Sequence, residues 1–281
     1  MYLSLKGPRW AVTLMEQLTD FFFPWGTYCI CCGNFIDRQR SYCICDHCIR
    51  HISWGNVEVP PQSLKQNHFT GPEAERLQEE GGIPVDSIRA CMKYGLYERR
   101  IIFELKYNRH TYVARIMGKI LADRILHDPG AAELLAADFI IPVPMHRAKE
   151  RQRGFNQVSK TARYLGACLG ISVLRDGLVR QAETAAQRSV EGRDRLANLA
   201  GAFGAAPADR RTQKSLTEQV QGKRVILLDD IFTTGATVLH CSRVLKDAGA
   251  ERVDVLVLAT GNDYAEGFFE KEFLAKSGEI M

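Results

Sequence analysis

Short apolar runs in the C-terminal two thirds of the chain predict the buried strands of a sheet. Runs that are apolar at successive positions, not at alternating ones, suit strands covered on both faces. They occur at Phe139–Val143, Arg224–Leu228 and Arg252–Ala259. Helical patterns separate these runs, and such alternation is typical of a parallel sheet with ligands at the carboxyl ends of its strands. We therefore predict an α/β fold, a parallel sheet with flanking helices, over residues 85–281.

The sequence predicts two helices of this domain, the first of them from apolar residues at helical spacing. One covers Phe155–Leu169. The other should begin beyond the acidic turn that follows the second strand, run to about Asp247 and end with Gly249 as its C-cap. Both helices connect strands, as a parallel sheet requires.

The N-terminal part of the chain has a different pattern. Trp10–Phe23 is spaced as one face of a helix, and Pro24 ends it. A cysteine-rich segment follows, and then a polar stretch rich in Pro, Gln, Glu and Gly, which is typical of a linker or insertion. We expect three parts: residues 1–55 with the helix and the cysteines, residues 56–84 as the linker or insertion, and residues 85–281.

Composition narrows the class of protein. Of the 281 residues, 46% are hydrophobic and 25% charged, as in folded globular proteins, and no apolar run reaches the ~20 residues of a membrane helix. The net charge of +4 permits anionic ligands without itself indicating nucleic acid. The nine cysteines are an odd number, with three of them scattered beyond residue 90, which favours a reducing compartment. We expect a cytoplasmic protein.

Two Cys-x-x-Cys pairs predict a metal site. Cys29 and Cys32 form the first, Cys45 and Cys48 the second, and the twelve residues 33–44 separate them. This spacing is close to that of zinc ribbons, in which four thiolates hold one Zn²⁺ tetrahedrally and organise a segment too small for its own core. We predict structural Zn²⁺ held by these four cysteines.

Alternatives to that ligand set stay open. Cys31 and Cys43 are interleaved with the pairs, so either could replace a neighbour, and His47 lies between two of the cysteines. Redox chemistry or an iron–sulfur cluster would use similar residues. A structural zinc site is the preferred interpretation.

An acidic pair after the second strand predicts a phosphoribosyl site. Asp229 and Asp230 would accept hydrogen bonds from two vicinal sugar hydroxyls. The residues after them, at the start of the second helix, offer backbone N–H groups and hydroxyls to a phosphate. They are Thr233, Thr234, Gly235, Ala236 and Thr237. The whole segment resembles the signature with which type I phosphoribosyltransferases bind phosphoribosyl pyrophosphate (PRPP), and it lacks the Gly-Lys-Ser/Thr of a Walker loop.

A second, basic segment follows the first strand. Arg147 and Arg153 lie there with Lys149 and Arg151, before the helix that opens near Phe155. We predict a cationic loop at the carboxyl end of that strand, where arginines could hold a pyrophosphate through paired hydrogen bonds. A solvated basic turn is the alternative.

Taken together, these motifs resemble those of the ComF family. The residues that carry the resemblance are Pro142-Val143-Pro144, Arg153-Gly154-Phe155-Asn156-Gln157, the acidic segment, Lys106-Tyr107, Thr184, Gln187, Arg195, Asn198 and Phe203. The resemblance implies a type I phosphoribosyltransferase-like domain preceded by a zinc ribbon. It places Arg180–Phe203 where type I enzymes have a mobile flap, with Arg195 among the residues available to PRPP.

The resemblance implies a transferase that uses PRPP and Mg²⁺. The reaction would move phosphoribosyl to an acceptor that the sequence does not identify and release pyrophosphate. Two other functions remain as alternatives: a non-catalytic PRPP-binding protein, and an accessory protein of the DNA-uptake (competence) machinery that binds single-stranded DNA.

Overall fold

The structure of the chain, a computed structural model, describes residues 27–37, 42–61, 82–107, 111–180, 202–208 and 213–261. The predicted helix Trp10–Phe23, most of the predicted linker and residues 181–201 of the region where a flap is expected lie outside the described residues. The chain divides into two compact units, Met1–His51 and Ile52–Met281.

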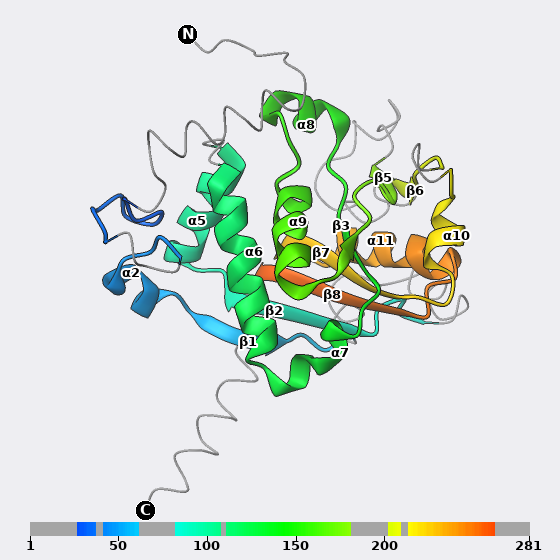
Figure 1. Cartoon of the computed structure of the whole chain (residues 1–281), viewed down its shortest axis with the longest axis horizontal. Helices are drawn as coiled ribbons and strands as arrows, with labels where there is room; N and C mark the ends of the chain where they lie inside the picture. The colour runs from blue at the N-terminus through cyan, green and yellow to red at the C-terminus, as the bar shows by residue number, and fades with distance from the viewer. Residues whose placement is uncertain are drawn as a thin grey trace, which may run out of the picture. The chain divides into compact units, whose positions relative to one another are not determined.

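A six-stranded sheet forms the centre of the larger unit, in the order β1-β2-β8-β7-β3-β4 (Figure 1). The strands are β1 (Trp54–Glu58), β2 (Ser87–Lys93), β3 (Phe139–Pro142), β4 (Ser172–Val173), β7 (Arg224–Phe232) and β8 (Arg252–Thr260). β1 pairs antiparallel with β2, and the other pairings are parallel. The predicted fold class is therefore confirmed, and residues 56–58, expected at the start of the linker, belong to β1.

Helices and a small two-stranded sheet pack around the six-stranded sheet. The helices of the larger unit are α5 (Leu96–Tyr107), α6 (Thr111–Leu126), η1 (Pro129–Ala131), α7 (Ala132–Leu135), α8 (Arg147–Arg153), α9 (Gln157–Leu169), α10 (Leu216–Val220) and α11 (Ala236–Asp247). In the two-stranded sheet β5 (Leu178–Arg180) pairs antiparallel with β6 (Phe203–Ala205). α9 contacts β3, β4, β7 and α6, whereas α11 contacts β7, β8 and β6.

The direction of the crossovers explains this division. From β3 the chain passes through α9 to β4, and from β7 it passes through α11 to β8, which lies in the opposite direction along the sheet. Right-handed crossovers in opposite directions place their helices on opposite faces. The crossovers therefore change direction between β3 and β7, and open α/β sheets bind their ligands at such a switch point.

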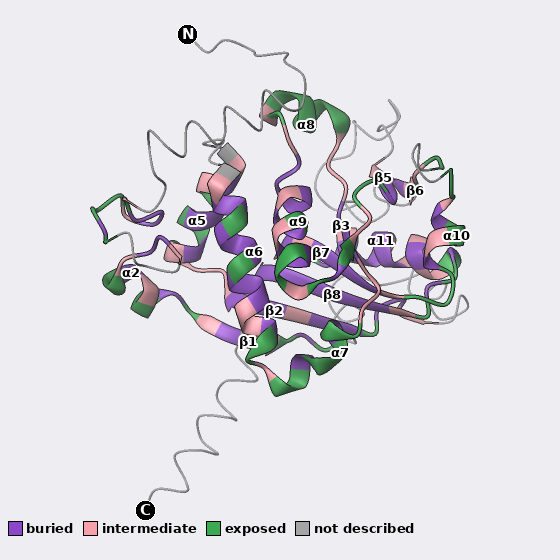
Figure 2. Ribbon diagram, viewed as in Figure 1, coloured by how far each residue is buried: buried purple, intermediate pink, exposed green. Residues whose placement is uncertain are grey.

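The core of the larger unit is built on β7 and β8. Every residue of Val225–Leu228 and of Val253–Thr260 is buried, as the purple strands in Figure 2 show. On one face Val238, Leu239 and Leu245 of α11 pack against these strands. The continuous apolar runs predicted from the sequence therefore reflect burial on both faces of a parallel sheet.

Close packing on the other face depends on a glycine. A Cβ added to Gly118 of α6 would lie 2.6 Å from the Cβ of Tyr164 on α9. Only glycine lets the two helices approach this closely. α6 and α9 lie side by side in Figure 1.

One element boundary differs from that predicted, and one agrees with it. β7 extends to Phe232 instead of ending at Leu228, because β8 pairs with it through Asp229, Ile231 and Phe232. The predicted acidic turn is therefore wrong: the acidic pair lies inside the strand. α11 ends as predicted near Asp247, with Ala248 as the C-cap and Gly249 after it in the left-handed conformation at φ 89°.

Candidate functional site

β7 continues beyond the end of its neighbour β3, at the boundary where the two crossovers run in opposite directions. The last β3–β7 pair is Pro142 with Leu228, and the Val143 amide then donates to the Leu228 carbonyl at 2.9 Å. Beyond it β7 continues beside β8 alone among the described strands. Asp229 and Asp230 are the first residues of this extension. The acidic pair thus borders the open end of the β3–β7 boundary.

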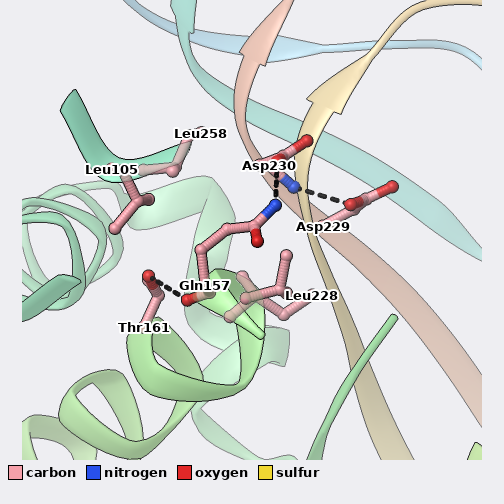
Figure 3. Close-up of a pocket in the computed structure, with 8 residues that line it drawn as sticks. Leu105, Gln157, Thr161, Leu228, Asp229, Asp230 and Leu258 are labelled. Carbon is pink, nitrogen blue, oxygen red and sulfur yellow. Dashed lines mark hydrogen bonds between the residues drawn. The ribbon is translucent and has the colours of Figure 1, made fainter. Parts of the chain in front are cut away.

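Asp230 faces α5 and α9 and is held from two sides. Its Oδ2 lies 2.8 Å from Lys106 Nζ and accepts a hydrogen bond from Gln157 Nε2 at 2.9 Å. Figure 3 shows the Gln157 amide pointing at Asp230 and not at Asp229. Asp230 is only 9% exposed, so its charge is compensated by partners instead of water. Sequence reasoning missed Lys106 and Gln157 as site residues, although both belong to the motifs that carry the ComF resemblance.

Asp229 occupies the opposite side of the strand, since successive side chains of a strand alternate. Its Oδ1 accepts a hydrogen bond from the Asp230 amide at 2.8 Å, and its charge acts on the Cys241 thiol of α11. Burial first, and the charge of Asp230 second, raise the pKa of Asp229 to about 8. The Asp230 N–H and the charge of Lys106 act in the lowering direction. The two acids therefore have different surroundings.

A narrow crevice on the α9 side contains part of this arrangement. It is lined by Leu105, Gln157, Val158, Thr161, Leu228, Asp229, Asp230 and Leu258 (Figure 3). These side chains pack closely and leave no room between them for a ligand. A ligand of the acidic pair would therefore approach from the open carboxyl edge of β7.

The residues after β7 turn into α11 as the sequence predicts. Thr233 and Thr234 are exposed, and Gly235 adopts the left-handed conformation at φ 78°. The Ala236 amide donates to Thr234 Oγ1 at 3.4 Å, and the Leu239 amide donates to the Gly235 carbonyl at 2.9 Å. A side chain at Gly235 would strain this turn. The five predicted phosphate-binding residues, Thr233 to Thr237, thus surround the start of a twelve-residue helix. Binding of PRPP by these residues stays a prediction.

The basic segment after β3 is a helix, so the predicted cationic loop is wrong in form. His146 caps α8 by accepting from the Ala148 amide at 3.2 Å, and Gly154 ends it in the left-handed conformation at φ 87°. These two caps stabilise a helix that the sequence pattern did not reveal, because α8 buries none of its residues. Arg147 begins the helix and Arg153 ends it, about 9 Å apart along the axis at 1.5 Å per residue.

Arg153 is the member of that helix that reaches the acidic pair, through Gln157. Its Nη1 donates to Gln157 Oε1 at 3.2 Å, while Gln157 Nε2 donates to Asp230. Arg147 lies at the far end of α8 and is exposed. Arg195, the third predicted arginine, lies outside the described residues.

Asn156 fixes the loop that follows β3. Its Oδ1 accepts from the Val158 and Ser159 amides at 2.9 and 3.3 Å and so caps α9. Its Nδ2 donates to the Val143 carbonyl at 3.1 Å. The predicted helix Phe155–Leu169 consequently begins at Gln157.

A separate cluster of cysteines lies in the unit Met1–His51. The Sγ atoms of Cys29, Cys32, Cys45 and Cys48 all lie within 4.8 Å of one another. Cys32 Sγ and Cys45 Sγ are 3.7 Å apart. Tetrahedral Zn²⁺ with Zn–S bonds of ~2.3 Å separates its sulfurs by ~3.8 Å, so these thiols fit such an ion. The four predicted ligands thus come together, and the cluster indicates a structural zinc site.

Backbone amides donate hydrogen bonds to two of these sulfurs. The Cys45 amide donates to Cys29 Sγ at 3.3 Å, and the Cys48 amide donates to Cys45 Sγ at 3.4 Å. Burial acts to raise the pKa of Cys29, but backbone N–H groups lower it to about 7. Thiolate is the form that binds metal.

The alternative ligands do not belong to this set of four. Cys31 and Cys43 are buried and are not among the four clustered sulfurs. His47 is exposed on α2 (Asp46–His51), where its ring contacts that of His51.

The part of the chain that contains the acidic segment is similar to known proteins. Residues 141–278 match the family model described as the phosphoribosyl transferase domain. DNA utilization protein YhgH of Escherichia coli O157:H7 is 28% identical over 215 residues, which cover 76% of this chain and 89% of that protein. Competence protein F of Haemophilus influenzae is 28% identical over 159 residues, 57% of this chain and 66% of that protein. Orotate phosphoribosyltransferase of Pyrococcus furiosus is 40% identical over 55 residues, 20% of this chain and 30% of that protein.

Two solved structures are similar over part of their length. The allosteric regulatory enzyme of purine biosynthesis has 20% identity and a TM-score of 0.33 over 51% of this chain and 25% of that one. UMP synthase of Leishmania donovani has 15% identity and a TM-score of 0.32 over 75% of this chain and 33% of that one.

The predicted resemblance is confirmed by the match of residues 141–278 to the phosphoribosyl transferase domain and by the relatives named for DNA utilization and competence. Among the described residues, every helix is too short or too polar to cross a lipid bilayer.

Proposed function

We propose that this chain binds PRPP with Mg²⁺ at the carboxyl ends of β3 and β7 and transfers its phosphoribosyl group to an acceptor, with release of pyrophosphate. One observation carries the proposal. Two adjacent carboxylates extend past the end of β3 and lead, within six residues, into a glycine turn and the start of α11. In a chain with a phosphoribosyl transferase domain, this is an arrangement of acceptors and donors suited to a ribose 5-phosphate.

The phosphate would be held by the start of α11. The first N–H groups of a helix have no partner within the helix, and the helix dipole favours an anion there. Thr233 and Thr234 are exposed at this turn and can add hydroxyl donors. The ribose hydroxyls would then lie over the acidic pair, and Arg147 and Arg153 on α8 are the candidate partners of the pyrophosphate.

Mg²⁺ would be held mainly by oxygens of PRPP. Among the residues that the structure describes, the cysteines form the only group of three or more side chains suited to a metal. That fits Mg²⁺, which keeps waters and substrate phosphates and needs only one or two protein carboxylates. When bound, the ion would neutralise charge on the departing pyrophosphate.

The acidic pair would stabilise positive charge that develops on the ribose ring as the bond to pyrophosphate breaks. Asp230 is held in place by Lys106 and Gln157. Asp229, with its pKa raised to about 8, is largely protonated at neutral pH in the free protein. Hydrogen bonds donated by the ribose hydroxyls would favour its ionised form, so binding and proton release should be coupled.

Calorimetry with PRPP and Mg²⁺ tests the binding step, and pyrophosphate release with a panel of nucleobases and amines tests the transfer. We expect saturable binding that depends on Mg²⁺, and pyrophosphate release with at least one acceptor. Absence of PRPP binding to folded protein would refute the proposal. Binding without turnover of any acceptor would support a non-catalytic PRPP-binding protein instead.

A second candidate function follows from the relatives named for DNA utilization and competence. An accessory role in DNA uptake would require contact with single-stranded DNA. The exposed helix α8 carries Arg147, Lys149, Arg151 and Arg153 against one acid, Glu150. DNA binding that weakens steeply with salt, and weakens further when these four residues are changed to Ala, would favour this role.

The zinc site is proposed to be structural. It would organise the unit Met1–His51, in which the described residues offer few apolar side chains besides cysteine and isoleucine. A cytoplasmic location stays a prediction from the odd number and the scattered positions of the cysteines.

A further inference from the structure

We propose that Lys106, at the end of α5, is a positioning residue of the phosphoribosyl site, and that α5 is therefore part of that site. This rests on the proposed function, since it concerns the acidic pair that would hold the ribose. Lys106 precedes the matched domain, which begins at residue 141.

The contact between Lys106 and Asp230 is short and shielded. Lys106 Nζ lies 2.8 Å from Asp230 Oδ2, with the two side chains only 19% and 12% exposed. Water screens such a pair far less than it screens an exposed one. Asp230 is the only acid paired with Lys106 in the described part of the chain.

Two donors converge on one oxygen and leave the other available. Lys106 and Gln157 both contact Oδ2 of Asp230. The Gln157 amide is itself oriented, because its Oε1 accepts from Arg153. Among the described residues, no hydrogen bond reaches Asp230 Oδ1. A carboxylate fixed by one oxygen presents the other in a defined direction, as a hydrogen bond to a ribose hydroxyl requires.

The charge of Lys106 also acts on the second acid. Asp229 and Asp230 are adjacent, and each charge disfavours the other; the charge of Lys106 opposes the rise in the pKa of Asp229. The charged and titratable groups around Asp229 are Asp230 on β7, Lys106 on α5, Cys241 on α11 and, facing Cys241, Arg180 on β5. Of these, Lys106 is the cation that acts on Asp229 directly.

A purely structural ion pair would behave differently. β7 is already fixed in the sheet by its pairing with β8 on both sides of the acidic pair, from Arg224 to Phe232. A buried ion pair is also a weak stabiliser, because desolvation offsets its attraction. The main effect of the Lys106–Asp230 ion pair would therefore be on the ionisation state and the orientation of the two carboxylates.

The test uses the full-length protein with PRPP and Mg²⁺, and compares Lys106→Met, Lys106→Gln and Lys106→Arg with the wild type. Affinity is measured by calorimetry from pH 6.5 to pH 9, and folding by thermal melting. We expect Lys106→Met and Lys106→Gln to weaken PRPP binding ten- to hundredfold and to move the pH midpoint of affinity upward, because Asp229 ionises less readily. Lys106→Arg should restore most of the affinity and return the midpoint toward the wild-type value.

Lys119→Met is the matched control. Lys119 pairs with Asp123 at 3.4 Å on the exposed side of α6, so this change also removes one lysine–aspartate pair. It should leave PRPP affinity and its pH midpoint unchanged.

Each outcome bears on one proposal. No PRPP binding by the wild type refutes the proposed function itself. If the wild type binds PRPP, and the folded Lys106→Met and Lys106→Gln variants keep its affinity and its pH midpoint, the proposed role of Lys106 is overturned. Weak binding with an unchanged midpoint and no rescue by arginine also overturns it, because that result describes a structural residue. If Lys106→Met does not fold, the polar Lys106→Gln decides between the same outcomes.

Discussion

Asn156 donates a hydrogen bond from Nδ2 to the carbonyl of Val143 at 3.1 Å, which ties the start of α9 to the residue that follows β3. The same side chain caps α9 through Oδ1. One buried amide thus fixes both ends of the segment that contains α8. Gln157, which donates to Asp230, follows Asn156 directly, and Arg153 orients Gln157. The geometry of the acidic pair therefore depends on the hydrogen bond between Asn156 and Val143.

We predict that Asn156→Ala lowers the free energy of unfolding by ~2–3 kcal/mol, since it removes a helix cap and leaves the buried Val143 carbonyl without its donor. Asn156→Ser keeps a capping oxygen but is too short to reach Val143, so it should cost about half as much. Urea unfolding measures both. Equal, small losses in the two variants would show that the bridge to Val143 contributes little.

The acidic pair gives the next prediction. Changing Asp229 or Asp230 to Asn should weaken PRPP binding by roughly ten- to hundredfold, because each loses a charge-assisted hydrogen bond worth ~1.5–3 kcal/mol. Lys223→Ala is the control, since Lys223 pairs with Asp138 at the opposite end of β7. Isothermal titration with PRPP and Mg²⁺ provides the measurement. Wild-type affinity in both Asn variants would mean that the acids do not contact the ligand.

Stability should depend on pH through Asp229. Its folded pKa of about 8 lies above the ordinary value of 3.8, so the folded state holds a proton that the unfolded state has lost between these two values. This contribution to stability therefore falls as pH rises from about 4 to about 8, by ~1.4 kcal/mol for each pH unit. Asp229→Asn removes the titrating group.

The measurement compares wild type and Asp229→Asn in urea from pH 5 to pH 9. The free energy of unfolding of the variant should increase relative to that of the wild type as the pH rises. Asp123→Asn, on the exposed side of α6, should show a difference that does not change with pH in this range. A constant difference for Asp229→Asn as well would mean that Asp229 titrates near its ordinary pKa.

Metal content tests the cysteine cluster. We predict one Zn²⁺ per chain, and loss of that ion when Cys29, Cys32, Cys45 or Cys48 is changed to Ser. The exposed Cys168, far along the chain, is the control, and Cys168→Ser should keep its metal. Elemental analysis of gently purified protein provides the answer, and iron in place of zinc would refute the ribbon.

The sequence predicted three of the six strands of the sheet, β3, β7 and β8, and it predicted the acidic segment, because these are local patterns. Apolar runs mark β7 and β8, and the order of residues from Asp229 to Thr237 is itself the candidate site. The predicted end of β7 was wrong because pairing with β8, a tertiary contact, continues the strand through residues that favour turns on their own.

Lys106 and Gln157 could not be identified as neighbours from the sequence. Their contacts with Asp230 join positions far apart in the chain, and a pattern of spacing holds no information on such contacts. α8 was missed for another reason: a helix without a buried face has no apolar periodicity to detect.

The position of β2 in the sheet affects how the protein can be made. β2 pairs with β8, and Ser87 bonds to Asp254 across a separation of 167 residues. At roughly 5–20 residues per second, a ribosome needs about ten to thirty seconds to deliver the partner strand. During that interval the apolar edge of β2 is a template for any other extended chain. Nascent chains of this protein should therefore depend on chaperones until β8 emerges, and truncation before Arg252 should yield aggregates.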